Sequence, residues 1–201
     1  SGIKLSRATL INYIQKAIGL LEPIYQAQRD HILQSKVLAM DEVPMKAGRK
    51  SKGKMRQTYF WPIYGEEDEI AFTWSKSRGT QFAVDQLKGF SGTLLSDGYT
   101  AYTKAVKQLN EHDEKVIHAT CWAHTRRYFE NALEMEPTLA QHALDLIAQL
   151  YQHEKHIRNA ELSADKALEY RQKNSEPIVA SFFEWVYEQR QNPEYLPSNK
   201  L

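Results

Sequence analysis

The chain has 201 residues, of which 42% are hydrophobic and 25% charged, and its formal net charge at pH 7 is +1. This composition is typical of a globular protein that buries a core. No apolar stretch approaches the ~18 residues that span a bilayer, so a membrane protein is not expected. The single cysteine, Cys121, excludes an internal disulfide framework and suits a reducing cytosol. Because the net charge alone does not indicate a nucleic-acid partner, the distribution of charge matters more than its sum.

The first 35 residues are predicted to be a helical segment. Ser6 is suited to cap the start of a helix, and apolar residues follow it at helical spacing. Pro23 is expected either to separate two helices or to kink one long helix. We expect this segment to pack on the main domain or on a partner rather than to recognise DNA directly. The chain starts at Ser1-Gly2 and is expected to begin inside a longer protein.

Residues 36–120 are predicted to form a mixed sheet with helices on its faces. The order of elements is β-β-β-α-β-α-β, which is an antiparallel meander followed by parallel crossovers, and the fold class is therefore α/β. The apolar runs and turn signals place the strands and helices. Strands are expected at residues 36–41, 57–64, 70–75, 93–96 and 115–119, and helices at 80–88 and 100–109.

Residues 121–201 are predicted to be entirely helical, apart from a turn-rich tail at 192–199. Apolar residues at helical spacing indicate helices at about 122–133, 139–157, 164–174 and 177–190. The chain is therefore expected to divide into an N-terminal helical segment (1–35), an α/β core (36–120) and a C-terminal helical segment (121–201).

Two aspartates each close a short apolar run. Asp41 ends residues 37–41, and Asp97 ends residues 93–97 just before Gly98. If both runs are neighbouring parallel strands, the two carboxylates meet at one edge of the sheet, where they could hold divalent metal for phosphoryl transfer. Each aspartate could instead simply begin a turn. The predicted order of elements favours the metal site, because the first and fourth strands of a ribonuclease-H-like fold are adjacent and parallel.

The segment between the first two predicted strands concentrates positive charge. It is expected to be a loop, with two glycines and no acid. Such a segment can be merely solvated, but its place after Asp41 favours sequence-independent, salt-sensitive contact with a phosphate backbone. Arg78, before Gly79, is a second candidate for a phosphate contact. The cations of the segment are Lys46, Arg49, Lys50, Lys52, Lys54 and Arg56.

The residues around Cys121 allow two interpretations. His118, Cys121 and His124 have the spacing of metal ligands, but a change from strand to helix between them makes convergence on zinc unfavourable. We instead expect Cys121 and Trp122 to pack under the sheet edge. His124, Arg126 and Arg127 are expected either to face the active-site side, where they would meet DNA phosphates, or to form a solvated helix face.

Four motifs in this order resemble the catalytic-domain signature of the insertion-sequence 66 family of DDE transposases. They are residues 38–44 (LAMDEVP), 75–79 (SKSRG), 96–102 (SDGYTAY) and 121–129 (CWAHTRRYF). The resemblance runs from about Leu5 to the C-terminus. It implies a ribonuclease-H-like fold in which the C-terminal helices are an insertion, with Asp41 and Asp97 as the first two acids of the DDE triad.

The resemblance also implies an activity. The intact protein would hold two Mg²⁺ or Mn²⁺ ions, cleave DNA strands at transposon ends and transfer them into target DNA. Its partners would be double-stranded DNA and, in the active complex, further copies of itself. The family is bacterial, so the cytoplasm near the nucleoid is the expected location.

The chain departs from the family pattern at the third acid. In the family this acid is a glutamate that follows the helical insertion, near Asn-Asn and Glu-Arg, and no such stretch occurs between Cys121 and Leu201. We therefore expect the chain to stop before the third acid and to be inactive alone. Glu130 and Glu134 could replace it by position but are expected to pair with the arginines of the same helix. The alternatives are a ribonuclease-H-like nuclease and an inactive DNA-binding or assembly domain.

Overall fold

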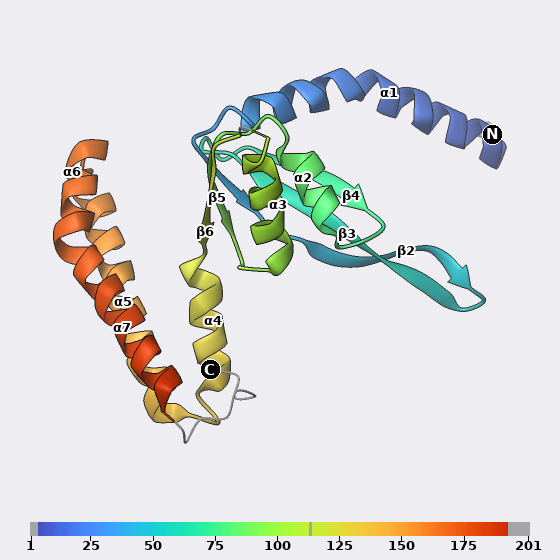
Figure 1. The fold of residues 1–201 in the computed structure, drawn as a ribbon. Coiled ribbons are helices and arrows are strands. Elements are labelled where there is room, and N and C mark those ends of the chain that lie inside the picture. Colours follow the sequence, from blue (N-terminus) through green and yellow to red (C-terminus); the bar gives the residue numbers. More distant parts are fainter. Residues whose placement is uncertain (1–3, 113, 193–201) are drawn as a thin grey trace. The chain divides into compact units, whose positions relative to one another are not determined.

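The computed structural model describes residues 4–112 and 114–192. The chain divides into two units, Ser1–Cys121 and Trp122–Leu201 (Figure 1). In the described residues, the first unit carries the sheet and the second is helical. The finer division predicted from the sequence stays a prediction, and residues 193–199 of the predicted tail lie outside the described residues.

The described part of the first unit contains a mixed sheet of six strands. The order is β2-β3-β1-β5-β6, with β4 paired to the other edge of β3. β5 runs parallel to both β1 and β6, and the remaining pairs are antiparallel. The α/β class is confirmed, and the arrangement is compatible with a ribonuclease-H-like fold. The strands are β1 (Val37–Met40), β2 (Val43–Ser51), β3 (Lys54–Tyr64), β4 (Ile70–Ser75), β5 (Gly92–Ser96) and β6 (Val116–Thr120).

β1 and β2 lie along the same edge of β3 and share one continuous register. Met40 pairs with Ile63, and Val43 pairs with Phe60, so only two residues separate the strands. The prediction that the basic segment is a loop was wrong, because β2 and β3 form a long hairpin that extends past the end of β4 (Figure 1). Basic side chains in both strands conceal the apolar alternation by which a strand is normally recognised.

One face of the sheet is covered by α2 (Thr80–Leu87) and α3 (Thr100–Asn110) (Figure 1). The core between these helices and the sheet holds the largest fully buried side chains of the unit, such as Trp61. The Trp61 indole N–H donates to Ser75 Oγ at 2.8 Å. By strand alternation the opposite face carries large apolar side chains that are 38–67% exposed, namely Val37, Val43, Phe60, Tyr64, Phe72, Trp74 and Ile117.

α1 (Arg7–Ile32) is a single helix that contains Pro23, so of the two alternatives the break into separate helices was wrong. Ser6 caps it as predicted, accepting the Thr9 N–H at 3.1 Å. Near its C-terminal end, Tyr25 Oη donates to Phe72 O at 3.1 Å and Gln28 Nε2 donates to Ile70 O at 3.0 Å. The helix thereby satisfies carbonyls of β4, an edge strand that would otherwise invite pairing with another chain.

The second unit consists of helices in its described residues. Arg171 bridges to Glu154 of α5 with two hydrogen bonds, of 2.7 and 2.8 Å. Phe182 and Ile147 are buried in its core. The two predicted helices at 164–174 and 177–190 are joined through a π-helical turn. The helices are α4 (Trp122–Ala132), α5 (Pro137–Asn159), α6 (Ala164–Tyr170), the π-helical turn η1 (Arg171–Ser175) and α7 (Glu176–Gln191).

Across the described residues of both units, the helices lack the combination of length and apolar character that would cross a bilayer.

Gly92 is predicted to be intolerant of any side chain. A Cβ at this position would lie less than 3.0 Å from Lys36 O, the carbonyl that accepts the Thr93 N–H and so joins β1 to β5. We expect Gly92→Ala to destabilise the chain by about 1–3 kcal/mol in urea unfolding, because main chain rather than a flexible side chain must move. The control is Gly19→Ala in α1, which has open space around it and should stabilise by about 0.5–1 kcal/mol. Equal effects of both substitutions would contradict the close approach.

Candidate active site

Asp41 and Asp97 lie side by side at the carboxyl ends of β1 and β5. The parallel register pairs residues 56 apart, such as Val37 with Thr93, and 56 is also the separation of the two aspartates. Each aspartate directly follows the last residue of its strand. Since neighbouring strands are ~4.8 Å apart, the two carboxylates come from adjacent positions at one sheet edge.

Main-chain N–H groups orient both carboxylates. Asp41 Oδ1 accepts the Glu42 N–H, and Asp97 Oδ1 accepts the Tyr99 N–H, each at 2.8 Å. Gly98, between Asp97 and Tyr99, has a φ of 82°, which an L-residue rarely adopts. The turn interpretation and the site interpretation of Asp97 are therefore compatible, because the turn fixes one carboxylate oxygen.

Glu42 is a buried carboxylate beside the aspartates that sequence reasoning missed. Its side chain is 1% exposed. Oε1 accepts hydrogen bonds from Arg78, and Oε2 accepts the hydroxyl of Tyr102. Burial raises the pKa of Glu42, and the bonds from Tyr102 and Arg78 oppose this shift. The available signal was alternation, because Leu38, Met40 and Glu42 share the buried face of one continuous strand register.

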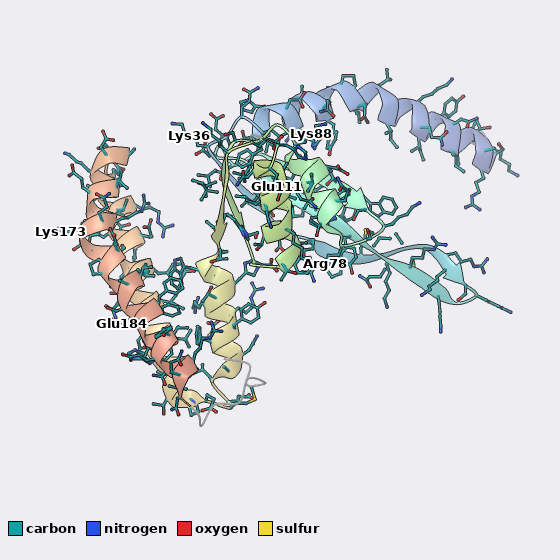
Figure 2. The ribbon with its side chains drawn as sticks, in the orientation of Figure 1. Lys36, Arg78, Lys88, Glu111, Lys173 and Glu184 are labelled. Carbon is teal, nitrogen blue, oxygen red and sulfur yellow. The ribbon has the colours of Figure 1, made fainter. Side chains whose placement is uncertain are left out.

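Arg78 links this buried carboxylate to the aspartate pair. It forms an ion pair with Glu42, lies 3.8 Å from Asp97 Oδ2 and stacks on the Tyr99 ring at 3.8 Å from the centroid. Figure 2 labels Arg78 near the start of the β2–β3 hairpin. The sequence suggested a direct phosphate contact, whereas in the structure the guanidinium of Arg78 already interacts with Glu42 and Asp97. Contact with phosphate stays a prediction.

Both ring nitrogens of His118 lie near hydroxyl groups of the first unit. Its Nε2 lies 2.8 Å from Ser96 Oγ, and its Nδ1 lies 3.4 Å from Thr103 Oγ1. Burial lowers the pKa of His118, and the charge of Asp97 opposes this shift. Cys121 donates its N–H to Ser96 O at 2.9 Å and is half-buried at the same sheet edge.

A separate group of potential metal ligands lies at the β3–β4 turn. The donor atoms of His31, Glu67 and Glu69 lie within 4.8 Å of one another. The side chains of His31 and Glu67 are 58% and 78% exposed, and the His31–Glu69 distance is 3.2 Å. These contacts suit a surface ion pair that joins the end of α1 to the turn.

The six cations predicted to contact DNA are all exposed on the β2–β3 hairpin. The hairpin begins at Val43, directly after the acidic pair Asp41-Glu42, and β2 and β3 then extend together as one ribbon (Figure 1), so the cations follow the acids along this hairpin. They are Lys46, Arg49, Lys50, Lys52, Lys54 and Arg56.

The other predicted phosphate contacts, His124, Arg126 and Arg127, lie on α4 in the second unit. Arg126 forms a 2.7 Å ion pair with Glu130 one helical turn later, as the spacing predicted. Their contact with DNA stays a prediction.

Comparison with known proteins identifies the family. The family described as "Transposase IS66 family" matches residues 1–201. Similar proteins of Sinorhizobium fredii (strain NBRC 101917 / NGR234) include uncharacterized protein y4qI, 26% identical over 195 residues, and uncharacterized protein y4jD, 27% identical over 190 residues. The matches cover 91% and 89% of this chain, and the chain spans 36% of the length of each relative. The chain belongs to the IS66 family of transposases.

Proposed function

We propose that this chain carries the first two acids of a DDE active site, Asp41 and Asp97, within a ribonuclease-H-like core. In the intact protein that site would cleave DNA strands at transposon ends and join them to target DNA. The observation that supports this most directly is the shared register of the two aspartates at the carboxyl ends of β1 and β5. Membership of the transposase family supplies the reaction class.

The residues present suit divalent metal. Asp41 and Asp97 offer carboxylate oxygens, the ligands that Mg²⁺ and Mn²⁺ prefer, and main-chain N–H groups already hold one oxygen of each. When bound, such ions would activate a water or a 3′-hydroxyl and stabilise the leaving oxygen. Arg78, 3.8 Å from Asp97 Oδ2, reduces repulsion among the clustered acids. Because the third acid is not recognisable in this chain, we expect the 201-residue chain to be inactive alone.

DNA would be held through its phosphates by the exposed cations of the β2–β3 hairpin. A basic ribbon binds DNA without sequence preference. Its affinity for DNA falls as the salt concentration rises, because each phosphate contact releases condensed counterions. The proposed arrangement therefore supplies a general DNA contact directly beside the acids. The active complex is expected to contain more than one copy of the protein, since a transposon has two ends.

Removal of metal tests this function. We expect EDTA to abolish cleavage of a DNA carrying a transposon end by the full-length protein, and Mg²⁺ or Mn²⁺ to restore it. Cleavage that persists in EDTA would contradict the proposal. Joined products with target DNA separate a transposase from the alternative, a nuclease that only cuts. DNA binding without any cleavage would favour the inactive binding domain.

A further inference from the structure

A hollow of about 250 Å³ lies where the β2–β3 hairpin leaves the sheet. Side chains from the three strands β2, β3 and β4 form it on one face, since Ala47 pairs with Arg56 and Phe60 pairs with Trp74. Thr58 is buried between them and donates its hydroxyl to Met45 O at 3.2 Å. The hollow therefore lies on the sheet surface, at the register shift between Ala47 and Arg49 and next to Lys76, which follows the end of β4.

The lining of this hollow combines an aromatic ring with positive charge. Trp74 is 45% exposed, and Arg49, Arg56 and Lys76 line the same space. No acid belongs to its lining among the described residues. A flat apolar ring beside cations is the combination that holds a nucleotide, because the base stacks on the ring while the phosphate pairs with the cations.

Two features indicate one unpaired nucleotide rather than a duplex. Bases inside a duplex are stacked on one another, so only an unpaired or extruded base offers its face to an indole. The hollow, of about 250 Å³, is also smaller than the ~300 Å³ at which pockets for drug-sized ligands begin, so it suits a single base whose phosphate stays outside on the exposed cations. We propose that this hollow binds an unpaired nucleotide of the DNA near the cleavage site, an inference that rests on the proposed function.

The position of the hollow agrees with this role. Val43 opens β2 directly after the acids, and Ala47 lies four residues further along the same strand. At ~3.3 Å per residue the hollow therefore begins about 13 Å beyond the start of the hairpin. That distance corresponds to a few nucleotides of DNA. A DNA strand with one phosphate at Asp41 and Asp97 could therefore place a nearby base on Trp74.

The competing explanation is that Trp74 simply belongs to the apolar open face of the sheet. Phe72 provides the matched control, because it lies two residues earlier on the same strand and face and is 53% exposed. Phe72 does not line the hollow. If the hollow binds a nucleotide, alanine substitutions at Trp74 and Phe72 should have different effects on DNA binding. If both residues only pack on the sheet, the two substitutions should have the same effect.

The experiment measures binding of the full-length protein to two labelled DNAs by fluorescence anisotropy. One DNA is fully paired, and the other has the same duplex with a short unpaired extension. We expect Trp74→Ala to bind the extended DNA about tenfold more weakly, with duplex binding unchanged. Trp74→Phe should retain most of the affinity, and Phe72→Ala should match the wild type. Arg56→Gln should weaken binding of both DNAs and reduce the salt dependence by about one phosphate contact.

Equal effects of Trp74→Ala and Phe72→Ala, or equal loss on both DNAs, would overturn the nucleotide site. Thermal melting of each variant ensures that only folded protein is compared. If the wild type cleaves DNA but shows no preference for the extended probe, the nucleotide site alone is wrong. If the wild type binds neither DNA, the proposed function fails together with it.

Discussion

Replacing Asp97 or Asp41 by asparagine in the full-length protein is expected to lower strand cleavage more than about a hundredfold. Loss of an outer partner of a metal ligand costs 10–100-fold, and these substitutions would change the ligands themselves. Asparagine keeps an oxygen that can accept the Tyr99 or Glu42 N–H, so the turn is preserved while the charge is lost. DNA binding should stay within about twofold, because the hairpin cations are untouched.

The measurement is cleavage of a labelled transposon end alongside anisotropy with the same DNA. Asp85→Asn is the matched control, since this exposed aspartate lies on α2 and contacts Gln81 rather than the site. Wild-type cleavage by either the Asp41 or the Asp97 variant would refute the assignment. A parallel loss of DNA binding would show that the substitution disturbs more than the metal ligands.

Arg78→Ala is expected to destabilise the first unit by about 2 kcal/mol at pH 7. Breaking a buried ion pair costs about 3–5 kcal/mol, because the remaining charge is left without its partner. Here the Arg78 side chain is 38% exposed, so solvent screens the pair and the cost is lower. The Glu42 carboxylate, 1% exposed, would retain the Tyr102 hydroxyl as its partner. Urea unfolding measures the loss.

The pH dependence of this variant has a definite sign. Burial raises the pKa of Glu42, and Arg78 is one of the groups that oppose the shift. Without Arg78 the pKa of Glu42 rises further above its unfolded value, so protonation favours the folded state. We expect the Arg78→Ala variant to recover stability relative to the wild type as the pH falls from 7 to 5. A difference that stays constant over this range would contradict a buried charged carboxylate.

Two comparisons isolate the interaction. In the double variant Arg78→Ala/Glu42→Gln, the loss should be smaller than the sum of the two single losses, because no buried charge remains. Glu154 and Arg171 offer a second two-bond pair, but their side chains are 41% and 47% exposed. Arg171→Ala should therefore cost less than about 1 kcal/mol.

The elements that sequence reasoning located well are those with one clear apolar period. The predicted strand at 70–75 ends at Ser75 in the structure, and the predicted helix at 100–109 starts at Thr100. The aspartates were identified because each closes an apolar run, and strand register then placed them side by side. Here the local pattern and the tertiary structure agree.

The failures have a different physical origin. The hairpin was missed because strand pairing, not local apolar alternation, stabilises it, with Gly53 at a φ of 73° in its turn. Glu42 was missed because its partners, Arg78 and Tyr102, are 36 and 60 residues away in the sequence. Its role becomes visible only when the fold brings these three residues together.

The continuous register of β1 and β2 constrains how this protein can change in length. Since side chains alternate along a strand, deleting or inserting one residue between Met40 and Val43 would transfer the β2 side chains to the opposite face, while β3 stays in register with β1 and β4. Ala47 would then leave the face that Arg56, Thr58 and Trp74 share, although its sequence would be unchanged. Homologous chains should therefore differ here by even numbers of residues. Only an even change in the two-residue spacer keeps the β2 side chains on the faces that they occupy in this protein.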